Sequence, residues 1–202
     1  LEPGFRPADS PARVVGRLPT TGDPRIEAAV DRALAEAELD VVRLDWNELE
    51  TGSNCFTTLY FNEIWDVDHA LVEARPADVG EDIHSVLGMV DVFRPGMATV
   101  MDELDTWRKS LLSLFERVEL LALPTIPVFP PRIDEVSPDT MLQVVIDITR
   151  HVSLFNAAGT PCTAQPVPVP GAQLPASLQL VGPLGGEELL LASAAVIETA
   201  VG

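Results

Sequence analysis

The order of elements near the N-terminus constrains the fold most, because it predicts a strand, a helix and a second strand in succession. Residues 12–18 (ARVVGRL) and 39–44 (LDVVRL) are short apolar runs of the kind found in buried strands. Between them, Asp23-Pro24 is a strong helix start, with a capping side chain followed by proline at the first helical position. Two strands joined by a helix at this spacing are expected to lie parallel, with a right-handed crossover.

Helix and strand patterns continue to alternate along the rest of the chain. We expect helices that start at Ser53 or Asn54 and run through Val67, cover Glu81–Phe93 and Met97–Val118, run from Asp139 towards Phe155, and close the chain over Glu187–Thr199. Strands are expected at Glu119–Leu123, Thr163–Val169 and Leu174–Val181. Prolines at alternate positions confine the second of these strands to a sheet edge, because proline has no backbone N–H to donate. The predicted fold class is α/β, with a mixed sheet that contains a parallel βαβ unit and is flanked by helices.

The N-terminal segment differs in character from the remainder of the chain. Residues 1–11 (LEPGFRPADSP) are proline-rich and without periodicity, so we expect a linker or a frayed N-terminus there. Residues 12–202 are expected to form one portion of a domain. Because the chain starts at Leu1 with neither an initiator methionine nor a signal segment, we expect a piece of a longer protein.

Charge and cysteine content restrict the partners of this chain. The 202 residues are 47% hydrophobic, which is enough for a buried core, and carry a net charge of -18. Such a surface repels phosphate backbones and anionic lipids, so we expect no nucleic acid partner and no membrane partner. No apolar run approaches the ~20 residues that span a bilayer. The two cysteines, Cys55 and Cys162, suit a reducing cytosol, so a cytoplasmic location is expected.

Motifs for most kinds of catalysis are missing from the sequence. The three histidines are far apart and neither cysteine belongs to a CxxC pair, so no metal site and no cofactor are expected. There is no phosphate-binding loop and no Gly-x-Ser-x-Gly elbow. Cys162 is interpreted as a buried thiol, although a hydrolase that uses Cys162 with His151 as its base stays open as a hypothesis.

Several segments carry motifs that occur together in one family. Phe155-Asn156 is followed by Gly159-Thr160-Pro161, by the run QLPASLQLVGP at residues 173–183, and by the acidic helix start Glu187-Glu188. Upstream, residues 120–127 read LLALPTIP, and Asp23-Pro24 precedes an alanine-rich helix and Val41-Val42. In their order along the chain, these segments resemble the C-terminal half of amidase signature enzymes. The resemblance covers nearly the whole chain.

The resemblance implies the C-terminal part of the amidase signature fold without its catalytic residues. Enzymes of that family hydrolyse carboxamides with a Ser-Ser-Lys triad, which lies in their first half beside a Gly-Ser-rich loop. This chain has no such loop, and its only lysine, Lys109, is in the wrong segment, so no catalytic residue is carried over. The resemblance places Val152 and Phe155 in the wall of the acyl pocket and Asn156 at the adjacent turn. Val152 and Phe155 are equally well explained as core residues.

Two functional hypotheses follow from this resemblance. In the first, the chain is the C-terminal portion of an amidase that acts on a small amide, and it is inactive alone. Its exposed sheet edge would then bind the missing N-terminal half or a second copy of the chain. In the alternative, the chain is a free-standing, non-catalytic interaction protein derived from half of an amidase.

Overall fold

A mixed five-stranded sheet forms the centre of the molecule. The computed structural model describes residues 4–202, apart from the side chains at positions 82, 138 and 139. The strands are β1 (Val14–Arg17), β2 (Asp40–Arg43), β3 (Leu120–Pro124), β4 (Cys162–Val167) and β5 (Ala176–Val181), in the order β2-β1-β3-β5-β4. β1 is parallel to both β2 and β3, whereas β5 is antiparallel to β3 and to β4. The predicted fold class, the parallel βαβ unit and the edge position of the proline-rich strand are all confirmed.

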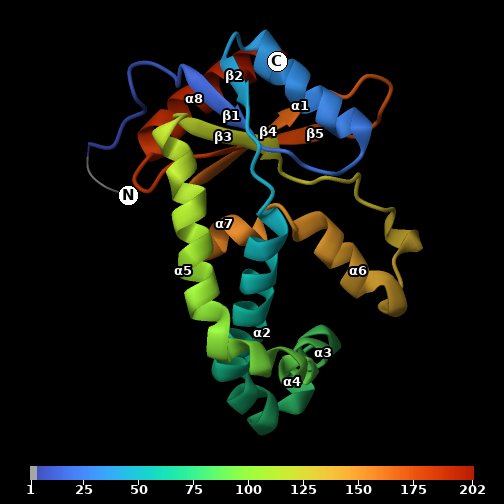
Figure 1. Ribbon diagram of the computed structural model, residues 1–202. Coiled ribbons are helices and arrows are strands. Elements are labelled where there is room, and N and C mark those ends of the chain that lie inside the picture. The colour runs from blue at the N-terminus through green and yellow to red at the C-terminus, as the bar shows by residue number, and fades with distance from the viewer. Residues whose placement is uncertain (1–3) are drawn as a thin grey trace.

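Helices cover both faces of the sheet. They are α1 (Pro24–Glu36), α2 (Leu49–Ala74), α3 (Glu81–Gly88), α4 (Val90–Phe93), α5 (Met97–Ser113), α6 (Pro138–Thr149), α7 (Ser153–Ala158) and α8 (Glu187–Val201). Figure 1 shows α1 and α8 above the sheet and α2, α5, α6 and α7 below it. Asp23 caps α1, where its side chain accepts from the Arg25 N–H at 2.9 Å, so the predicted helix start is confirmed.

Each face of the sheet has its own apolar core. Alternate residues of a strand point to opposite faces, so β3 contributes to both cores. Leu120 and Ala122 pack towards α1 and α8, whereas Leu121 and Leu123 pack towards α5 and α7. All four side chains are fully buried. The sheet therefore positions both helical layers, and the loops at the ends of its strands lie between these layers.

The second helix begins earlier than its local sequence predicts. The predicted caps, Ser53 and Asn54, lie inside α2, which starts at Leu49. The reason is a tertiary contact: the indole N–H of Trp107 donates to the Glu48 carbonyl at 2.8 Å and packs against Gly52. This contact anchors the start of α2 on α5, and local capping preferences are overridden.

Two predicted helices are broken in the structure. The helix expected from Asp139 towards Phe155 divides into α6 and α7 at residues 150–152, and the one over Glu81–Phe93 divides into α3 and α4. At the first break the His151 ring bonds to the carbonyl of Pro124 at 2.9 Å, which ties the turn to the end of β3. No glycine or proline marks this turn in the sequence, so periodicity alone could not locate it.

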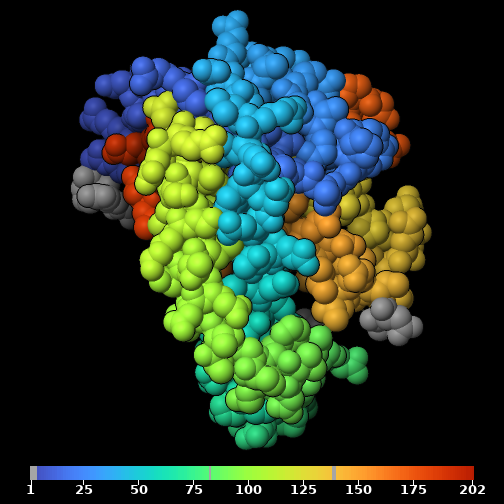
Figure 2. All heavy atoms as spheres, viewed as in Figure 1, coloured from blue at the N-terminus to red at the C-terminus, as the bar shows by residue number. Residues whose placement is uncertain are grey.

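The two longest helices form an arm that projects from the sheet. Figures 1 and 2 show α2 and α5 running away from the strands, with α3 and α4 at the far end. In the described part of the chain no helix is both long and apolar enough to cross a membrane. Residues 1–3, the beginning of the predicted linker, lie outside the described residues. The remainder of that segment is tied to α8, because the Ala8 N–H donates to the Glu188 carbonyl at 2.9 Å. Directly after the segment, the Ala12 N–H donates to the Ser193 hydroxyl at 2.9 Å.

Candidate functional site

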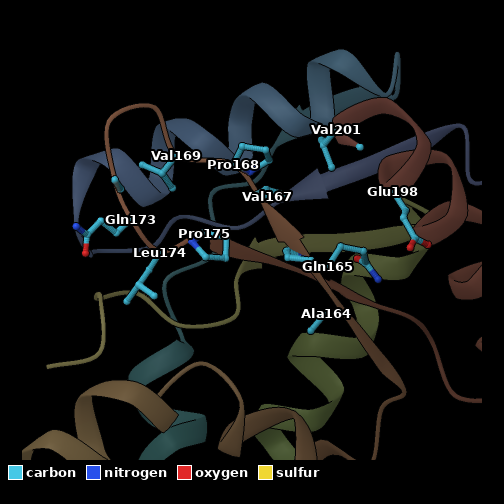
Figure 3. A pocket seen from close by; sticks show the side chains of 13 residues that line it. Ala164, Gln165, Val167, Pro168, Val169, Gln173, Leu174, Pro175, Glu198 and Val201 are labelled. Atoms are coloured by element: carbon cyan, nitrogen blue, oxygen red, sulfur yellow. The ribbon is translucent and has the colours of Figure 1, made fainter. Parts of the chain in front are cut away.

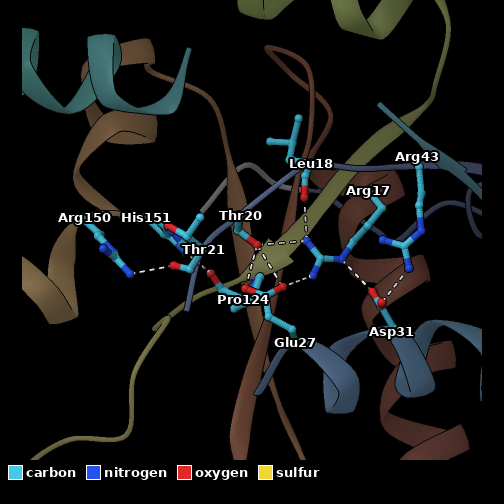
Figure 4. A network of polar contacts seen from close by, with 10 residues as sticks. All are labelled: Arg17, Leu18, Thr20, Thr21, Glu27, Asp31, Arg43, Pro124, Arg150 and His151. Atoms are coloured by element: carbon cyan, nitrogen blue, oxygen red, sulfur yellow. Dashed lines mark hydrogen bonds and ion pairs between the residues drawn. The ribbon is translucent and has the colours of Figure 1, made fainter. Parts of the chain in front are cut away.

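Polar side chains gather where the parallel strands β1 and β3 end. The carboxyl ends of parallel strands share one edge of a sheet, where α/β proteins commonly bind ligands. Figure 4 shows Arg17 from the last position of β1, Glu27 and Asp31 from α1, and Arg150 and His151 from the turn before α7. This edge is therefore the first candidate for a functional site.

Arg17 is the centre of this network and is almost completely buried. Its side chain is 3% exposed, and each guanidinium nitrogen has a partner. Nε donates to Asp31 at 2.8 Å, Nη1 to the Leu18 carbonyl at 2.7 Å, and Nη2 to Glu27. The Thr20 hydroxyl donates to the same Glu27 carboxylate at 2.8 Å. These contacts join β1 to α1 and leave Arg17 no unpaired nitrogen for a ligand, so we interpret its role as structural.

Asp31 is held ionised by two arginines. Partial burial alone would raise the pKa of its carboxyl, but hydrogen bonds from Arg43 and Arg17 outweigh that effect and lower the pKa. The Arg43 guanidinium reaches the second carboxylate oxygen at 2.7 Å from the exposed side. A carboxylate with both oxygens engaged and a lowered pKa is poorly suited to act as a general acid or base at neutral pH.

His151 is a buried neutral imidazole. Because a carbonyl oxygen only accepts, the 2.9 Å contact with Pro124 requires a proton on Nδ1, which leaves the Nε2 lone pair free in the neutral ring. Burial lowers the pKa of His151, the neighbouring Arg150 lowers it further, and the bond to Pro124 opposes both effects. Arg150 itself donates to the Thr21 carbonyl at 2.6 Å, so the turn is tied to the loop after β1.

We expect His151 to make the protein less stable in mild acid. Its folded pKa lies below the ordinary 6.5, so the unfolded chain binds more protons once the pH falls below 6.5. The free energy of unfolding should therefore decrease as the pH drops from 6.5 to the lowered folded pKa. In the variant His151→Asn the side-chain amide can still donate to Pro124, and this part of the pH dependence should disappear. Urea unfolding at pH 7.5 and pH 5 measures both proteins; an equal loss of stability in the two would contradict the assignment.

The three residues that the sequence suggests for a pocket wall lie on or beside α7. Phe155 is 1% exposed and belongs to the core between the sheet and α5. Val152 is half-buried at the N-terminal end of α7, and Asn156 is exposed on that helix. The Asn156 carbonyl accepts from the N–H of Gly159, which ends the helix with a φ of +73° that glycine adopts without strain. α7 thus brings the three residues together, with Phe155 inside the core and the other two towards the surface.

An open pocket lies elsewhere, on the α8 side of β4. Figure 3 shows it between β4, residues 168–175 and the C-terminal end of α8, with a volume of about 650 Å³. Its lining is mostly apolar and proline-rich, and the one charged group is Glu198. None of the lining residues is a serine, cysteine, lysine or histidine. This pocket therefore offers no serine, cysteine or lysine nucleophile for amide hydrolysis, and Glu198 is the one carboxylate side chain in its lining.

Neither Lys109, the only lysine of the chain, nor Cys162 is activated for catalysis. Lys109 is an exposed residue of α5 whose ammonium binds Asp105 at 2.6 Å, and this hydrogen bond raises its pKa. A lysine that acts as a base needs the opposite shift. The prediction that Cys162 is a buried thiol is wrong, because the residue is exposed at the start of β4, a sheet edge that no other strand of the described chain covers. Partial desolvation still raises the pKa of its thiol, whereas a reactive cysteine needs a lowered pKa.

The sheet register also separates Cys162 from His151. Cys162 lies opposite Val181, which lies opposite Leu121, and Pro124, the partner of His151, is three residues further along β3. Two strand spacings and three residues correspond to about 14 Å between the Cα atoms of Cys162 and Pro124. This separation and the raised pKa of Cys162 give no support to the hypothesis of a Cys162–His151 hydrolase. Among the described residues, no group of three His, Cys, Asp or Glu side chains is arranged to hold a metal ion.

Comparisons with known proteins identify relatives that are much longer than this chain. A family model described as Amidase matches residues 19–191. A glutamyl-tRNA(Gln) amidotransferase subunit of Halobacterium salinarum is 28% identical over 173 residues, which are 82% of this chain and 38% of that protein. A putative amidase of Synechocystis is 26% identical over 89% of this chain and 35% of its own length.

A solved structure has the same fold. The structure of 6-aminohexanoate cyclic dimer hydrolase complexed with substrate matches with a TM-score of 0.76 and 24% identity, over 96% of this chain and 46% of that chain. At this level of identity the match shows the fold alone. The chain thus spans less than half the length of each of these three relatives.

Proposed function

The chain belongs to the Amidase family, and we propose from this that it is the C-terminal portion of an enzyme that hydrolyses carboxylic acid amides to an acid and ammonia or an amine. The observation that carries the proposal is the family match over residues 19–191. In this proposal the chain supplies strands, helices and part of the substrate pocket, and it is inactive alone. The free-standing interaction protein is the alternative outcome of the experiment below.

The nucleophile in this proposal comes from residues outside this chain. The proposal is supported by the exposed, ion-paired Lys109 and by the raised pKa of Cys162, since neither side chain is activated for attack on an amide. It is also supported by the share of the relatives that the chain spans, 38% and 35%. An assembled triad acts as a unit and its members cannot be replaced singly, so a scaffold portion without them has no residual triad activity.

Within this proposal α7 forms part of the pocket wall. The acyl group of a small amide would approach the N-terminal end of α7, where Val152 is half-buried and Asn156 is exposed. Phe155 would support this wall from the core beneath it, because it is 1% exposed. The two free cysteines further support a cytoplasmic location as part of the proposal.

Amide hydrolysis by the chain alone and in combination tests the proposal. Ammonia or amine release from aliphatic and aryl amides, such as propionamide and acetanilide, is measured with the 202-residue chain by itself. The measurement is then repeated after co-folding with the polypeptide encoded immediately upstream. We expect no turnover above the uncatalysed rate in the first case and turnover in the second. If the complex forms but hydrolyses nothing, the chain is an interaction protein and the proposal fails.

The pocket-wall residues are tested in the active combination. Val152→Ala enlarges the proposed wall and should change KM for amides with different acyl groups by about 10-fold, the effect of one to two methylenes in an apolar pocket. Val42→Ala, an equal change at an exposed strand on the other edge of the sheet, is the matched control and should change neither kcat nor KM. Equal kinetics for the Val152 variant and wild type would remove α7 from the pocket.

A further inference from the structure

The sheet has two open edges, and the backbone groups at the β4 edge are only partly available for pairing. The Gly182 N–H donates to the Pro161 carbonyl at 2.9 Å, which sets the phase of the antiparallel β4–β5 ladder. Residues then alternate along β4 between bonding to β5 and pointing away. Thr163 and Gln165 bond to β5, whereas Cys162 and Ala164 direct their N–H and C=O groups outward. An added strand can therefore bond to this edge through two N–H groups.

Prolines limit how far such pairing can extend. Pro166 and Pro168 occupy the next two outward positions after Ala164, and neither has an N–H to donate. At these positions proline removes no bond of the existing ladder, because the ladder bonds are made by the residues between them. The β4 edge thus accepts a strand beside residues 162–164 and resists one beyond them.

One face of β4 is covered and the other is bare. Gln165 and Val167 point towards α8 and are buried. The alternate residues, Cys162, Ala164 and Pro166, point to the opposite face, the side of α7, and are exposed. A strand that is covered on one face only, at an edge without a neighbour, leaves apolar surface in water.

Buried polar atoms without partners lie on both faces of the β4–β5 hairpin, and those on the bare face belong to Gln179, which lies opposite Ala164. Among the described residues, five buried side-chain atoms lack a hydrogen-bond partner, and four of them belong to Thr163, Gln165 and Gln179 of the β4–β5 hairpin. Gln179 is 2% exposed and leaves both polar atoms of its side chain unpaired. Such groups cost free energy unless a further chain or water completes their bonding.

An apolar helix stands uncovered on the bare side of the sheet. Four large apolar side chains of α6 are between 43% and 50% exposed: Met141, Leu142, Val145 and Ile146. Figure 1 shows α6 below the sheet with α7, and Figure 2 shows its atoms at the surface without another segment over them on this face. Helices of water-soluble domains bury such residues, so α6 lacks its packing partner in this chain.

We infer that the edge of β4 at residues 162–164, its bare face and the apolar side of α6 form one docking surface for the remainder of the amidase domain. The occupant adds a strand beside Cys162 and Ala164 and packs over α6. This inference rests on the proposed function, because the occupant is the part of the domain that the longer relatives possess. The present chain covers 46% of one of those relatives. The β2 edge is left free.

Hydrogen exchange in the assembled protein tests which edge is used. In the parallel β1–β2 ladder the N–H groups of Asp40 and Leu44 bond to β1. The N–H groups of Val41 and Arg43 therefore point outward from the β2 edge. They are the counterparts of the outward N–H groups of Cys162 and Ala164 at the β4 edge. In the active assembly we expect the Cys162 and Ala164 amides to exchange about 100-fold more slowly than the unpaired rate. The Val41 and Arg43 amides should exchange at the unpaired rate. Protection of the β2 amides with free exchange at β4 would overturn the inference.

A pair of proline substitutions provides a matched second test. Ala164→Pro removes an outward N–H from β4, and Val41→Pro removes one from β2, and neither breaks a ladder bond of this chain. We expect Ala164→Pro to weaken assembly with the upstream polypeptide at least about 10-fold, as judged by the dissociation constant. Val41→Pro should leave it unchanged. Equal effects of the two variants would contradict the inference.

The apolar side of α6 is tested with exposed residues, so that folding is little affected. Leu142→Glu places a charge on the proposed surface, and we expect it to weaken assembly about 10-fold or more. Val67→Glu makes a comparable change at a residue of the arm that is 75% exposed, and should have no effect.

The hydrogen-exchange result separates the docking surface from the proposed function. An assembly that hydrolyses amides but protects the β2 amides instead of the β4 amides would refute the docking surface and leave the proposed function standing. Protection of Cys162 and Ala164 in a dimer of this chain alone would identify a second copy as the occupant and overturn the inference.

Discussion

Replacing Arg17 with methionine is expected to lower the free energy of unfolding by about 3 kcal/mol, because the change breaks a buried charge network. The arginine side chain is 3% exposed, and its removal leaves the Glu27 and Asp31 carboxylates facing a site without a cation. The connection between β1 and α1, two elements of the predicted βαβ unit, is lost as well. Equilibrium unfolding in urea at pH 7 measures the difference.

Arg43→Met is the matched control for this prediction. Arg43 binds the same Asp31 carboxylate at 2.7 Å, but its side chain is 74% exposed. An exposed ion pair contributes about 0–1 kcal/mol, so this variant should lose little. In the double variant Arg17→Met, Glu27→Leu no carboxylate of Glu27 remains to be compensated, and part of the lost stability should return. If Arg17→Met lowers the free energy of unfolding no more than Arg43→Met does, the prediction that the buried arginine contributes more than the exposed one is contradicted.

Replacing Gly52 with alanine is expected to destabilise the arm by about 2 kcal/mol. An added Cβ would lie 2.3 Å from Cζ2 of the Trp107 ring, which is 1% exposed and has no space to move. Overpacking costs about 1–3 kcal/mol, and a contact this short belongs at the upper end of that range. Subtracting the roughly 1 kcal/mol of helix propensity that alanine gains leaves a net loss of about 2 kcal/mol. For a chain of this size the expected decrease in Tm is about 4–8 °C.

Gly88→Ala is the corresponding control in another helix. No atom lies within 4 Å of a Cβ added at Gly88, so the substitution meets open space in α3. Its Tm should stay the same or rise, because alanine favours the helix without a clash. A decrease of similar size in both variants would show that the effect of Gly52→Ala comes from helix backbone rather than from contact with Trp107.

Elements with strong periodic patterns were predictable from the sequence, and breaks set by tertiary contacts were not. The cap at Asp23, the parallel βαβ unit and the edge position of β4 all follow from local residue types, and the structure confirms them. The start of α2 was misplaced because it depends on Trp107, which lies more than fifty residues later in the chain. The turn between α6 and α7 depends in the same way on a bond from His151 to β3.

The polar site at the ends of β1 and β3 was missed by sequence reasoning, although a signal exists. Glu27 and Asp31 are four residues apart and therefore lie on one face of α1, and Arg17 is a charged residue at the end of an apolar strand. Two carboxylates at helical spacing, together with an arginine that ends an apolar strand, are the sequence signal for such a buried network. The docking surface at β4 needs the ladder phase and the unpaired atoms of Gln179, which only the structure supplies.

Covalent labelling of the active assembly tests the central claim, that this chain is the scaffold of an amidase and does not carry its nucleophile. The assembly is treated with a fluorophosphonate, which reacts with activated serines, until amide hydrolysis stops, and the adduct is located by peptide mass spectrometry. We predict one adduct, on a serine outside residues 1–202, with all peptides of this chain unmodified. An adduct on any residue of this chain that forms in step with the loss of activity would contradict the account.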